Sequence, residues 1–284
     1  MKFEGIYTPA ITPLSADGSI DTQAFAEVLE FLVESKVHGI VIGGSTGEYY
    51  AHTAEERLAL AAHASEVIAG RLPLVVGTGA IRTEDSLAYA LPTSREIAEH
   101  VLAVDRAAGL PIMLYNYPAR MGVEMDEAFF AAVAGCRNIV AIKESSGSTA
   151  QLHRLACRHP RIALSCGWDD QALEFFAWGA RSWVCAGSNF IPGEHLALYQ
   201  ACVVENDFAK GRRIMAAMMP LMDFLESGHF VQSIKHGCEL AGLRAGGVRA
   251  PLKALDEAGK AALAEIVARL KGEVARIVEG GRHD

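Results

Sequence analysis

The sequence lacks the features that mark membrane, secreted or nucleic-acid-binding proteins. No window approaches 18 uninterrupted apolar residues, and the start, MKFEGIYTPAITPL, has no basic segment followed by an apolar one. There is no run of Lys and Arg, and 26 basic against 34 acidic residues give a formal net charge of -8. Such a chain offers no footprint for nucleic acid or an anionic membrane surface. We therefore expect a soluble cytoplasmic protein with neither kind of partner.

Two further absences narrow the class of protein. The six cysteines are scattered without a C-x-x-C pair, which argues against a zinc site and against a disulfide framework. The first β-branched run leads into TPLSADGS and not into a G-x-G-x-x-G turn. A dinucleotide-binding sheet needs that turn after its first strand, so this class is not expected.

What the sequence does contain is an alternation of strand and helix patterns. Short β-branched runs are each followed by an amphipathic stretch of helical period. This alternation predicts parallel strands joined by crossover helices, either in an open doubly wound sheet or in a closed barrel. The predicted strands are Gly5 to Thr12, Gly39 to Ser45, Leu74 to Thr78, Ile112 to Tyr117, Ile139 to Ser145, Ile162 to Cys166 and Trp183 to Ala186.

The polar residues at the strand ends favour the barrel, because the carboxyl ends of barrel strands converge on one mouth. These residues are Ser45, Thr46, Thr78, Tyr115, Lys143 and Ser188. We predict a TIM (β/α)8-type barrel over residues 1–205 and a C-terminal helical extension over residues 206–284, which has only helical patterns. The methionines of Gly211 to Leu225 are expected to fill the core between helices.

The spacing of the strands indicates a missing unit. Only 38 residues separate the starts at Leu74 and Ile112, whereas two βα units at the earlier spacing need about 70. The intervening stretch contains two helix patterns broken at Pro92, and no strand pattern. We therefore expect the fourth strand to be missing between these two starts.

The first chemical feature is a lysine inside the apolar strand IVAIKESSG. Side chains alternate along a strand, so Lys143 points to the side opposite Glu144. A lysine inside a barrel loses water, which penalises its ammonium form, and a neutral amine is a nucleophile toward a carbonyl. The alternative is a strand-end lysine that reaches out to water.

The second feature is the glycine-rich turn IGGSTGE between a strand and a helix that begins near Thr53. Backbone N–H groups and the hydroxyls of Ser45 and Thr46 could approach an anion such as a carboxylate. The lysine of a P-loop is missing. A plain structural turn is the alternative.

The third feature is the stretch YNYPAR at a strand end. Tyr115 and Tyr117 share a face, and Arg120 is expected in the following loop, where its guanidinium could form a fork to a carboxylate. The alternative is that the tyrosines serve in packing and Arg120 is solvated.

Together, and in this order, the motifs resemble those of the dihydrodipicolinate synthase and N-acetylneuraminate lyase family of Schiff-base aldolases, over nearly the whole chain. The family consists of barrels with a C-terminal helical extension, usually homotetramers, so the resemblance implies a homo-oligomer, a dimer or tetramer. The matching pieces are TPAITP at Thr8, GSTGE at Gly44, GTG at Gly77, YNYP at Tyr115, IKESSG at Ile142 and CGWDD at Cys166.

The resemblance implies a role for each matching residue. Lys143 would form an imine with pyruvate or another 2-keto acid, and Tyr115 would shuttle protons. Ser45 and Thr46 would hold the carboxylate of the keto acid, and Thr46 would also hydrogen-bond Tyr115. Gly167 and Val184 would line the pocket beside the lysine. No metal or organic cofactor is implied.

The second substrate is less narrowly defined. An arginine at the place of Arg120 holds the carboxylate of aspartate semialdehyde in the synthase branch, which favours a dihydrodipicolinate synthase-like reaction. Tyr49 and Tyr50 stand where small residues are common in that branch, and the stretch Phe230 to Lys235 lacks its Asn-Pro segment. The alternative is an aldolase or dehydratase for 2-keto-3-deoxy sugar acids.

A third hypothesis, from another class, is a non-catalytic barrel that binds a keto acid or acts in assembly. Compared with the family, about 20 residues, including the fourth strand, are missing at the junction of Ala90 and Leu91. Either the sequence omits a segment there, or the protein is a truncated relative with an impaired proton relay. The non-catalytic hypothesis follows from the missing strand, because loss of one strand exposes two strand edges that could pair with other chains. Lys235 receives no role from the sequence.

Overall fold

The computed structural model describes residues 3–78 and 93–280. The chain divides into two compact units, which are described separately. Unit 1 comprises residues 1–4 and 81–184, and unit 2 comprises residues 5–80 and 185–284. The predicted junction at Ala90 and Leu91 lies outside the described residues. The predicted boundary between residues 205 and 206 divides the chain differently and stays a prediction.

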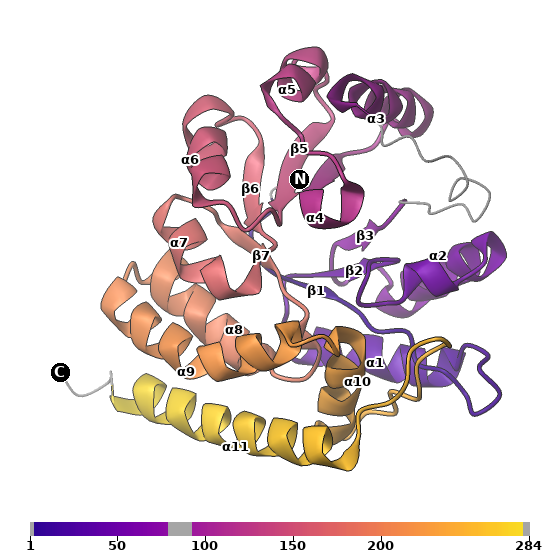
Figure 1. Cartoon of the computed structure of the whole chain (residues 1–284), viewed down its shortest axis with the longest axis vertical. Helices are drawn as coiled ribbons and strands as arrows, with labels where there is room; N and C mark the ends of the chain where they lie inside the picture. Colours follow the sequence, from indigo (N-terminus) through magenta and orange to yellow (C-terminus); the bar gives the residue numbers. More distant parts are fainter. Residues whose placement is uncertain (1–2, 79–92, 281–284) are drawn as a thin grey trace. The chain divides into compact units, whose positions relative to one another are not determined.

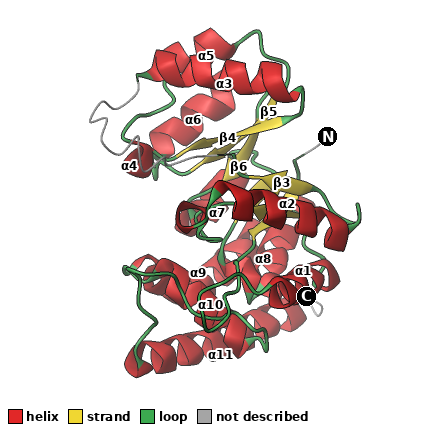
Figure 2. Cartoon of the chain, turned by 90° about the vertical axis from the view of Figure 1, so that its right-hand side faces the viewer, coloured by secondary structure: helices red, strands yellow, loops and turns green. Residues whose placement is uncertain are grey.

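Unit 1 carries parallel strands in the order β7-β6-β5-β4, with helices α3, α5 and α6 covering one of their faces (Figure 2). Short helices follow β4 and β6. The elements are α3 (Ser94–Ala108), β4 (Ile112–Asn116), α4 (Pro118–Met121), α5 (Glu127–Val133), β5 (Ile139–Glu144), α6 (Thr149–Arg158), β6 (Ala163–Cys166), η3 (Asp169–Gln171), α7 (Ala172–Ala177) and β7 (Ser182–Val184).

Unit 2 carries parallel strands in the order β3-β2-β1 and all of the helices that follow residue 185 (Figure 1). The elements are β1 (Gly5–Pro9), α1 (Thr22–Glu34), β2 (Gly39–Ile42), η1 (Tyr49–Ala51), α2 (Ala54–Ile68), β3 (Leu74–Val76), η4 (Gly187–Asn189), α8 (Pro192–Tyr199), η5 (Gln200–Val204), α9 (Phe208–Glu226), α10 (Phe230–Leu240) and α11 (Glu257–Gly280).

The strand predictions are confirmed at all seven places, although most of the strands end one to three residues earlier than expected. The difference falls at their carboxyl ends, where the chain turns into loops that carry polar residues. The described residues contain no eighth strand.

Helix starts follow the capping signals of the sequence. Thr53 and Thr93 each accept a hydrogen bond from the backbone N–H three residues on, at Glu56 and Glu96. In turn, a carboxylate oxygen of each glutamate accepts a hydrogen bond from the backbone N–H of its threonine, at 2.9 Å for Glu56 and 2.7 Å for Glu96. These reciprocal bonds satisfy N–H groups that a helix leaves unpaired at its start.

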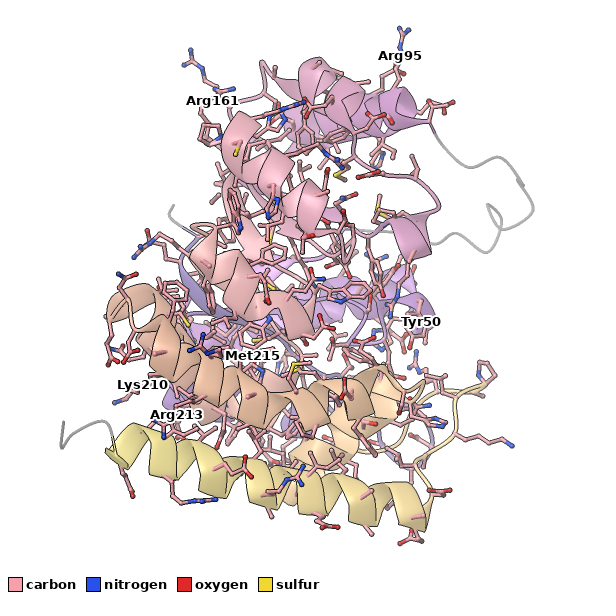
Figure 3. The ribbon with its side chains drawn as sticks, turned by 60° about the vertical axis from the view of Figure 1, so that its left-hand side comes forward. Tyr50, Arg95, Arg161, Lys210, Arg213 and Met215 are labelled. Atoms are coloured by element: carbon pink, nitrogen blue, oxygen red, sulfur yellow. The ribbon has the colours of Figure 1, made fainter. Side chains whose placement is uncertain are left out.

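The C-terminal helices pack through apolar side chains. Helix α11 lies alongside α9 (Figure 1), and Met218 and Met222 of α9 are at most 2% exposed. Met215, labelled in Figure 3, is also buried. The prediction that the methionines of Gly211 to Leu225 fill the core is therefore confirmed for Met215, Met218 and Met222, whereas Met219 is half-buried. Among the described residues, no helix is long and apolar enough to cross a membrane.

Candidate active site

Tyr115 and Lys143 lie side by side at the ends of two neighbouring strands in unit 1. They are register partners in the parallel pair of β4 and β5, so their side chains leave the sheet on the same face. The Lys143 Nζ stands 4.5 Å from the centroid of the Tyr115 ring. An ammonium over a phenol face is a favourable arrangement, and it leaves the amine beside the phenol.

The register partners of Lys143 on the next two strands are small polar residues. Lys143 pairs in register with Ser165 of β6, which pairs with Ser182 of β7. Both serines are fully buried, and their hydroxyls have no hydrogen-bond partner among the described residues. The sequence pattern did not single them out. Their small side chains leave the neighbourhood of the lysine polar.

Gly167 lies directly against the stem of Lys143. A Cβ at this position would lie 2.2 Å from Ser145 Oγ, 2.6 Å from Lys143 Cγ and 2.8 Å from Lys143 Cε, which is closer than such atoms can approach. The Gly167 carbonyl accepts a hydrogen bond of 2.8 Å from the Ser145 hydroxyl, which holds the backbone in place. Glycine is therefore required here by the space that the Ser145 hydroxyl and the Lys143 side chain occupy. Val184, at the end of β7, is 4% exposed.

Aromatic side chains extend this face beyond the strand ends. The Tyr117 ring lies 5.9 Å from that of Tyr115, and Trp168 meets Tyr117 edge-on with a centroid separation of 6.1 Å. Trp168 lies two residues after the end of β6, and the sequence signalled it by this place behind a strand and by the CGWDD piece. These three rings form a wall next to the lysine.

Arg120 is part of a short helix, so the prediction that it lies in a loop is wrong. Pro118 opens helix α4, and Gly122 closes it with a left-handed backbone of φ 71°. Proline suits the first helical position because its fixed φ is helical and its missing N–H would be unpaired there. The guanidinium lies over the Tyr117 ring, 4.9 Å from the centroid. Arg120 is exposed to solvent at the edge of the aromatic wall.

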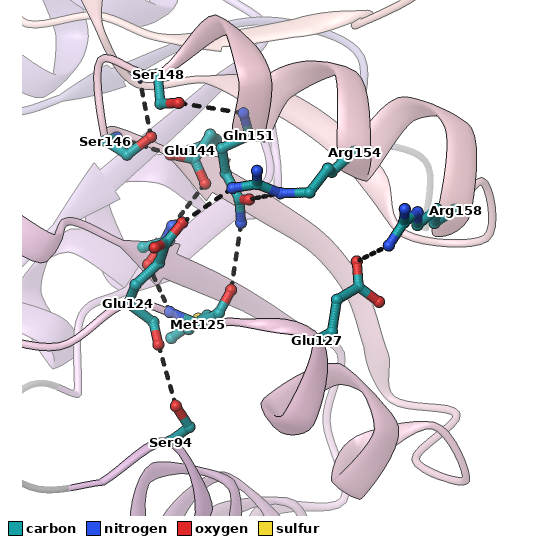
Figure 4. A network of polar contacts seen from close by, with 11 residues as sticks. Ser94, Glu124, Met125, Glu127, Glu144, Ser146, Ser148, Gln151, Arg154 and Arg158 are labelled. Atoms are coloured by element: carbon teal, nitrogen blue, oxygen red, sulfur yellow. Dashed lines mark hydrogen bonds and ion pairs between the residues drawn. The ribbon is translucent and has the colours of Figure 1, made fainter.

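Glu144 lies on the opposite face of β5, as the alternation predicted, and anchors a buried polar network (Figure 4). Its two carboxylate oxygens accept hydrogen bonds of 2.7 Å from Asn116 Nδ2 and from the Ser146 N–H. Asn116 Oδ1 accepts from the Met125 N–H, and Gln151 donates to the Met125 carbonyl. Burial raises the pKa of Glu144, and the hydrogen bonds from Asn116 and Ser146 oppose that shift.

Ser45 and Thr46 lie in unit 2, in the turn that follows β2. Thr46 is 4% exposed, and Ser45 is half-buried. The two are not among the residues gathered around Lys143 in unit 1, so their predicted contacts with a keto acid and with Tyr115 stay predictions. Among the described residues, no group of three or more His, Cys, Asp or Glu side chains is placed to hold a metal ion.

The fold and the face around Lys143 define an α/β-barrel type of protein with an amine and a phenol at the strand ends. The model of the dihydrodipicolinate synthetase family matches residues 2–91 and 88–270. The two matched segments meet where the strand spacing predicts missing residues. The chain belongs to this family, and it is an enzyme of the lyase and synthase group that the family comprises.

Individual relatives agree with this assignment. A 4-hydroxy-tetrahydrodipicolinate synthase of Exiguobacterium sibiricum is 34% identical over 96% of this chain and 99% of its own length. An N-acetylneuraminate lyase of Rhizobium meliloti is 29% identical over 94% of this chain and 95% of its own.

Solved structures are similar as well. The 4-hydroxy-tetrahydrodipicolinate synthase of Methylacidiphilum fumariolicum SolV matches 98% of this chain and 99% of its own with a TM-score of 0.89 at 27% identity. The dihydrodipicolinate synthase of Aquifex aeolicus matches 95% of this chain and 98% of its own with a TM-score of 0.87 at 27% identity. The predicted fold class, a TIM-type barrel with a C-terminal helical extension, is thereby confirmed.

Replacement of Gly167 by alanine should push the Lys143 side chain out of its position. We expect Gly167→Ala to lower the free energy of unfolding by about 1–3 kcal/mol, as overpacking in a filled interior does. Gly135→Ala is the matched control, because a Cβ there meets open space. Urea unfolding measures both, and a crystal structure of Gly167→Ala would locate Lys143. An unshifted lysine in a variant of unchanged stability would contradict the packing described here.

Replacement of Glu144 by glutamine should destabilise the fold, because one of its two buried donors loses its acceptor. We expect a loss of about 1–3 kcal/mol at neutral pH in urea unfolding. The pKa of Glu144 is raised in the folded chain, so the folded form binds the proton more tightly than the unfolded form does. The wild type should therefore gain stability relative to Glu144→Gln as the pH falls through that raised pKa toward the ordinary value of 4.5. If the free energy of unfolding of the wild type instead fell relative to that of Glu144→Gln as the pH is lowered through this range, the raised pKa would be contradicted.

Proposed function

We propose that this enzyme is a class I, lysine Schiff-base lyase that condenses pyruvate with an aldehyde, as a dihydrodipicolinate synthase does. Lys143 is the nucleophile, and Tyr115 carries protons to and from the imine and the adduct. Ser45 and Thr46 bind the carboxylate of pyruvate with their hydroxyl and N–H groups. Gly167 and Val184 line the pocket beside the lysine. The proposal needs no cofactor.

The observation that carries this proposal is the register pairing of Tyr115 with Lys143. The amine attacks the keto carbon of pyruvate, and the carbinolamine releases water to form a protonated imine. The imine withdraws electrons from the neighbouring methyl carbon, which loses a proton and becomes the nucleophilic carbon of an enamine. The Tyr115 ring centroid lies 4.5 Å from Lys143 Nζ, so a phenol, a group able to carry these protons, stands beside the amine.

Arg120 supports aspartate semialdehyde as the second substrate. The guanidinium rests on the Tyr117 ring at the edge of the aromatic wall, and its fork of donors fits a carboxylate. The enamine carbon would attack the aldehyde carbon, and the proton for the new alkoxide would come from Tyr115. Hydrolysis of the imine then returns the Lys143 amine. We further propose a homo-oligomer, a dimer or tetramer, in the cytoplasm.

The aromatic residues support a second candidate, cleavage or dehydration of 2-keto-3-deoxy sugar acids. Tyr49 stacks under the Arg57 guanidinium at 5.7 Å, and Tyr50 is 44% exposed immediately after it. Two bulky phenols after Glu48 add amphipathic surface that a long hydroxylated substrate could contact. Such a substrate also presents a keto group and a carboxylate, so the roles of Lys143, Ser45 and Thr46 would be the same.

The decisive experiment is borohydride trapping with pyruvate, followed by peptide mass spectrometry. We expect a reduced pyruvate adduct on the peptide that contains Lys143, because the imine carbon accepts hydride from borohydride. Lys143→Arg should abolish the adduct, since a guanidinium does not form an imine under these conditions. Lys253→Arg, which changes an exposed lysine, is the matched control and should trap like the wild type. Folded wild type without an adduct would favour the non-catalytic hypothesis instead.

Replacement of Arg120 by alanine tests the second substrate. We expect Arg120→Ala to lower kcat/KM for aspartate semialdehyde by about 10- to 100-fold, the range for losing a charged hydrogen-bonded pair. The half-saturating pyruvate concentration in trapping should stay within about twofold. Arg95→Ala is the matched control, because the Arg95 side chain is 86% exposed on α3 (Figure 3). Equal losses in both measurements would contradict the role given to Arg120.

A further inference from the structure

A buried ion pair in unit 2 joins the C-terminal helices to the glycine-rich turn. Lys235 of α10 places its Nζ 2.5 Å from Glu48 Oε1, and the two residues are 2% and 1% exposed. The same Nζ donates a hydrogen bond of 2.5 Å to the Gly247 carbonyl. A lysine is almost never buried this completely unless it is paired, so Glu48 is the reason that Lys235 can lie here. Burial lowers the pKa of Lys235, and the Glu48 carboxylate opposes that shift.

Glu48 is also the residue that closes the turn. Its backbone is left-handed, with φ 57° and ψ 36°, a conformation that residues other than glycine rarely adopt. Its N–H donates to the Ser45 carbonyl at 3.1 Å, and the Gly47 N–H donates to the Gly44 carbonyl at 3.1 Å. The position of Glu48 therefore sets the backbone of Ser45 and Thr46. A left-handed backbone persists only when surrounding contacts hold it.

A second contact from the C-terminal segment holds the other oxygen of Glu48. The Arg249 N–H donates to Glu48 Oε2 at 3.2 Å. The Arg249 guanidinium is held in turn by a bidentate ion pair with the Glu56 carboxylate, with N–O distances of 2.5 Å and 2.8 Å. It also donates a hydrogen bond to the Ala51 carbonyl. This pairing lowers the pKa of Glu56 to about 2. Both carboxylate oxygens of Glu48 are thus held by residues that follow position 205.

We propose that Lys235 is a positioning residue for the keto acid, because it holds Glu48 and thereby the Ser45–Thr46 turn in the form that binds the carboxylate. This inference rests on the proposed function of that turn. Without Lys235, a buried carboxylate would remain with one oxygen unpaired, and Glu48 would turn toward water. The turn would then lose the contact that keeps its last residue left-handed. The C-terminal extension is thereby a part of the substrate-binding apparatus.

The test measures the pyruvate concentration that gives half-maximal borohydride trapping, together with the melting temperature. We expect Lys235→Met to raise that concentration at least about tenfold and to lower the melting temperature, because it leaves a buried charge. KM for the aldehyde should stay within about twofold. Arg244→Met is the matched control, because it removes an exposed pair from the same segment to Asp21 and Glu27. It should leave the half-saturating concentration unchanged.

The double variant Glu48→Gln/Lys235→Met separates positioning from stability, and it serves where Lys235→Met alone does not fold. No charge is left unpaired in it, so the melting temperature should recover. The half-saturating concentration should stay raised, because the link between α10 and the turn is gone. Recovery of both quantities together would overturn the positioning role, as would an unchanged half-saturating concentration in the single variant.

The outcomes also distinguish this inference from the proposed function. A wild type that traps no pyruvate on Lys143 overturns the function and the positioning role together. A wild type that traps pyruvate, with variants that bind it equally well, overturns the positioning role alone.

Discussion

The register of neighbouring parallel strands is the constraint on which the site depends. Because register partners leave a sheet on the same face, pairing Tyr115 with Lys143 brings a phenol and an amine together without a loop to position them. The next residues along the two strands, Asn116 and Glu144, are partners on the opposite face. One face thus carries the phenol and the amine of the proposed reaction, and the other carries a buried hydrogen-bonded scaffold.

The scaffold face explains how the reactive face can be kept rigid. Glu144 accepts from Asn116 and from the Ser146 N–H, so the ends of β4 and β5 are joined just beyond the reactive pair. A buried carboxylate is costly unless it is fully hydrogen-bonded, and here both oxygens are used. The same residue is therefore unsuited to act as a base for the imine, since its oxygens are committed on the far side of the strand.

The sequence was sufficient for features that depend on local pattern. The β-branched runs located the strands, alternation assigned Lys143 and Glu144 to opposite faces, and a helix was expected near Thr53, where α2 begins. Even the helical setting of Arg120 was readable in principle, because a proline two residues earlier commonly opens a helix.

Contacts between residues far apart in the chain could not be read in this way. The edge-on contact of Trp168 with Tyr117 depends on how two loops leave β4 and β6. The pair of Lys235 with Glu48 depends on the packing of α10 against the first βα turns. Neither has a spacing rule, because tertiary packing alone brings such residues together. A lysine inside a helix pattern resembles any solvated lysine until its burial is known.

Two lysines of this chain, Lys143 and Lys235, show how burial and partner decide the role of one residue type. Lys143 lies over an aromatic ring and against a glycine, a setting that leaves its amine free of a carboxylate partner among the contacts around it. Lys235 is fixed by a carboxylate and a carbonyl, so its amine is committed to structure and cannot serve as a nucleophile. The proposed roles of the two lysines, one as nucleophile and one as positioning residue, depend on this contrast in partners. In the proposal, the left-handed Glu48 turn connects Lys235 to the chemistry, because a strained backbone transmits the loss of one contact to the residues next to it.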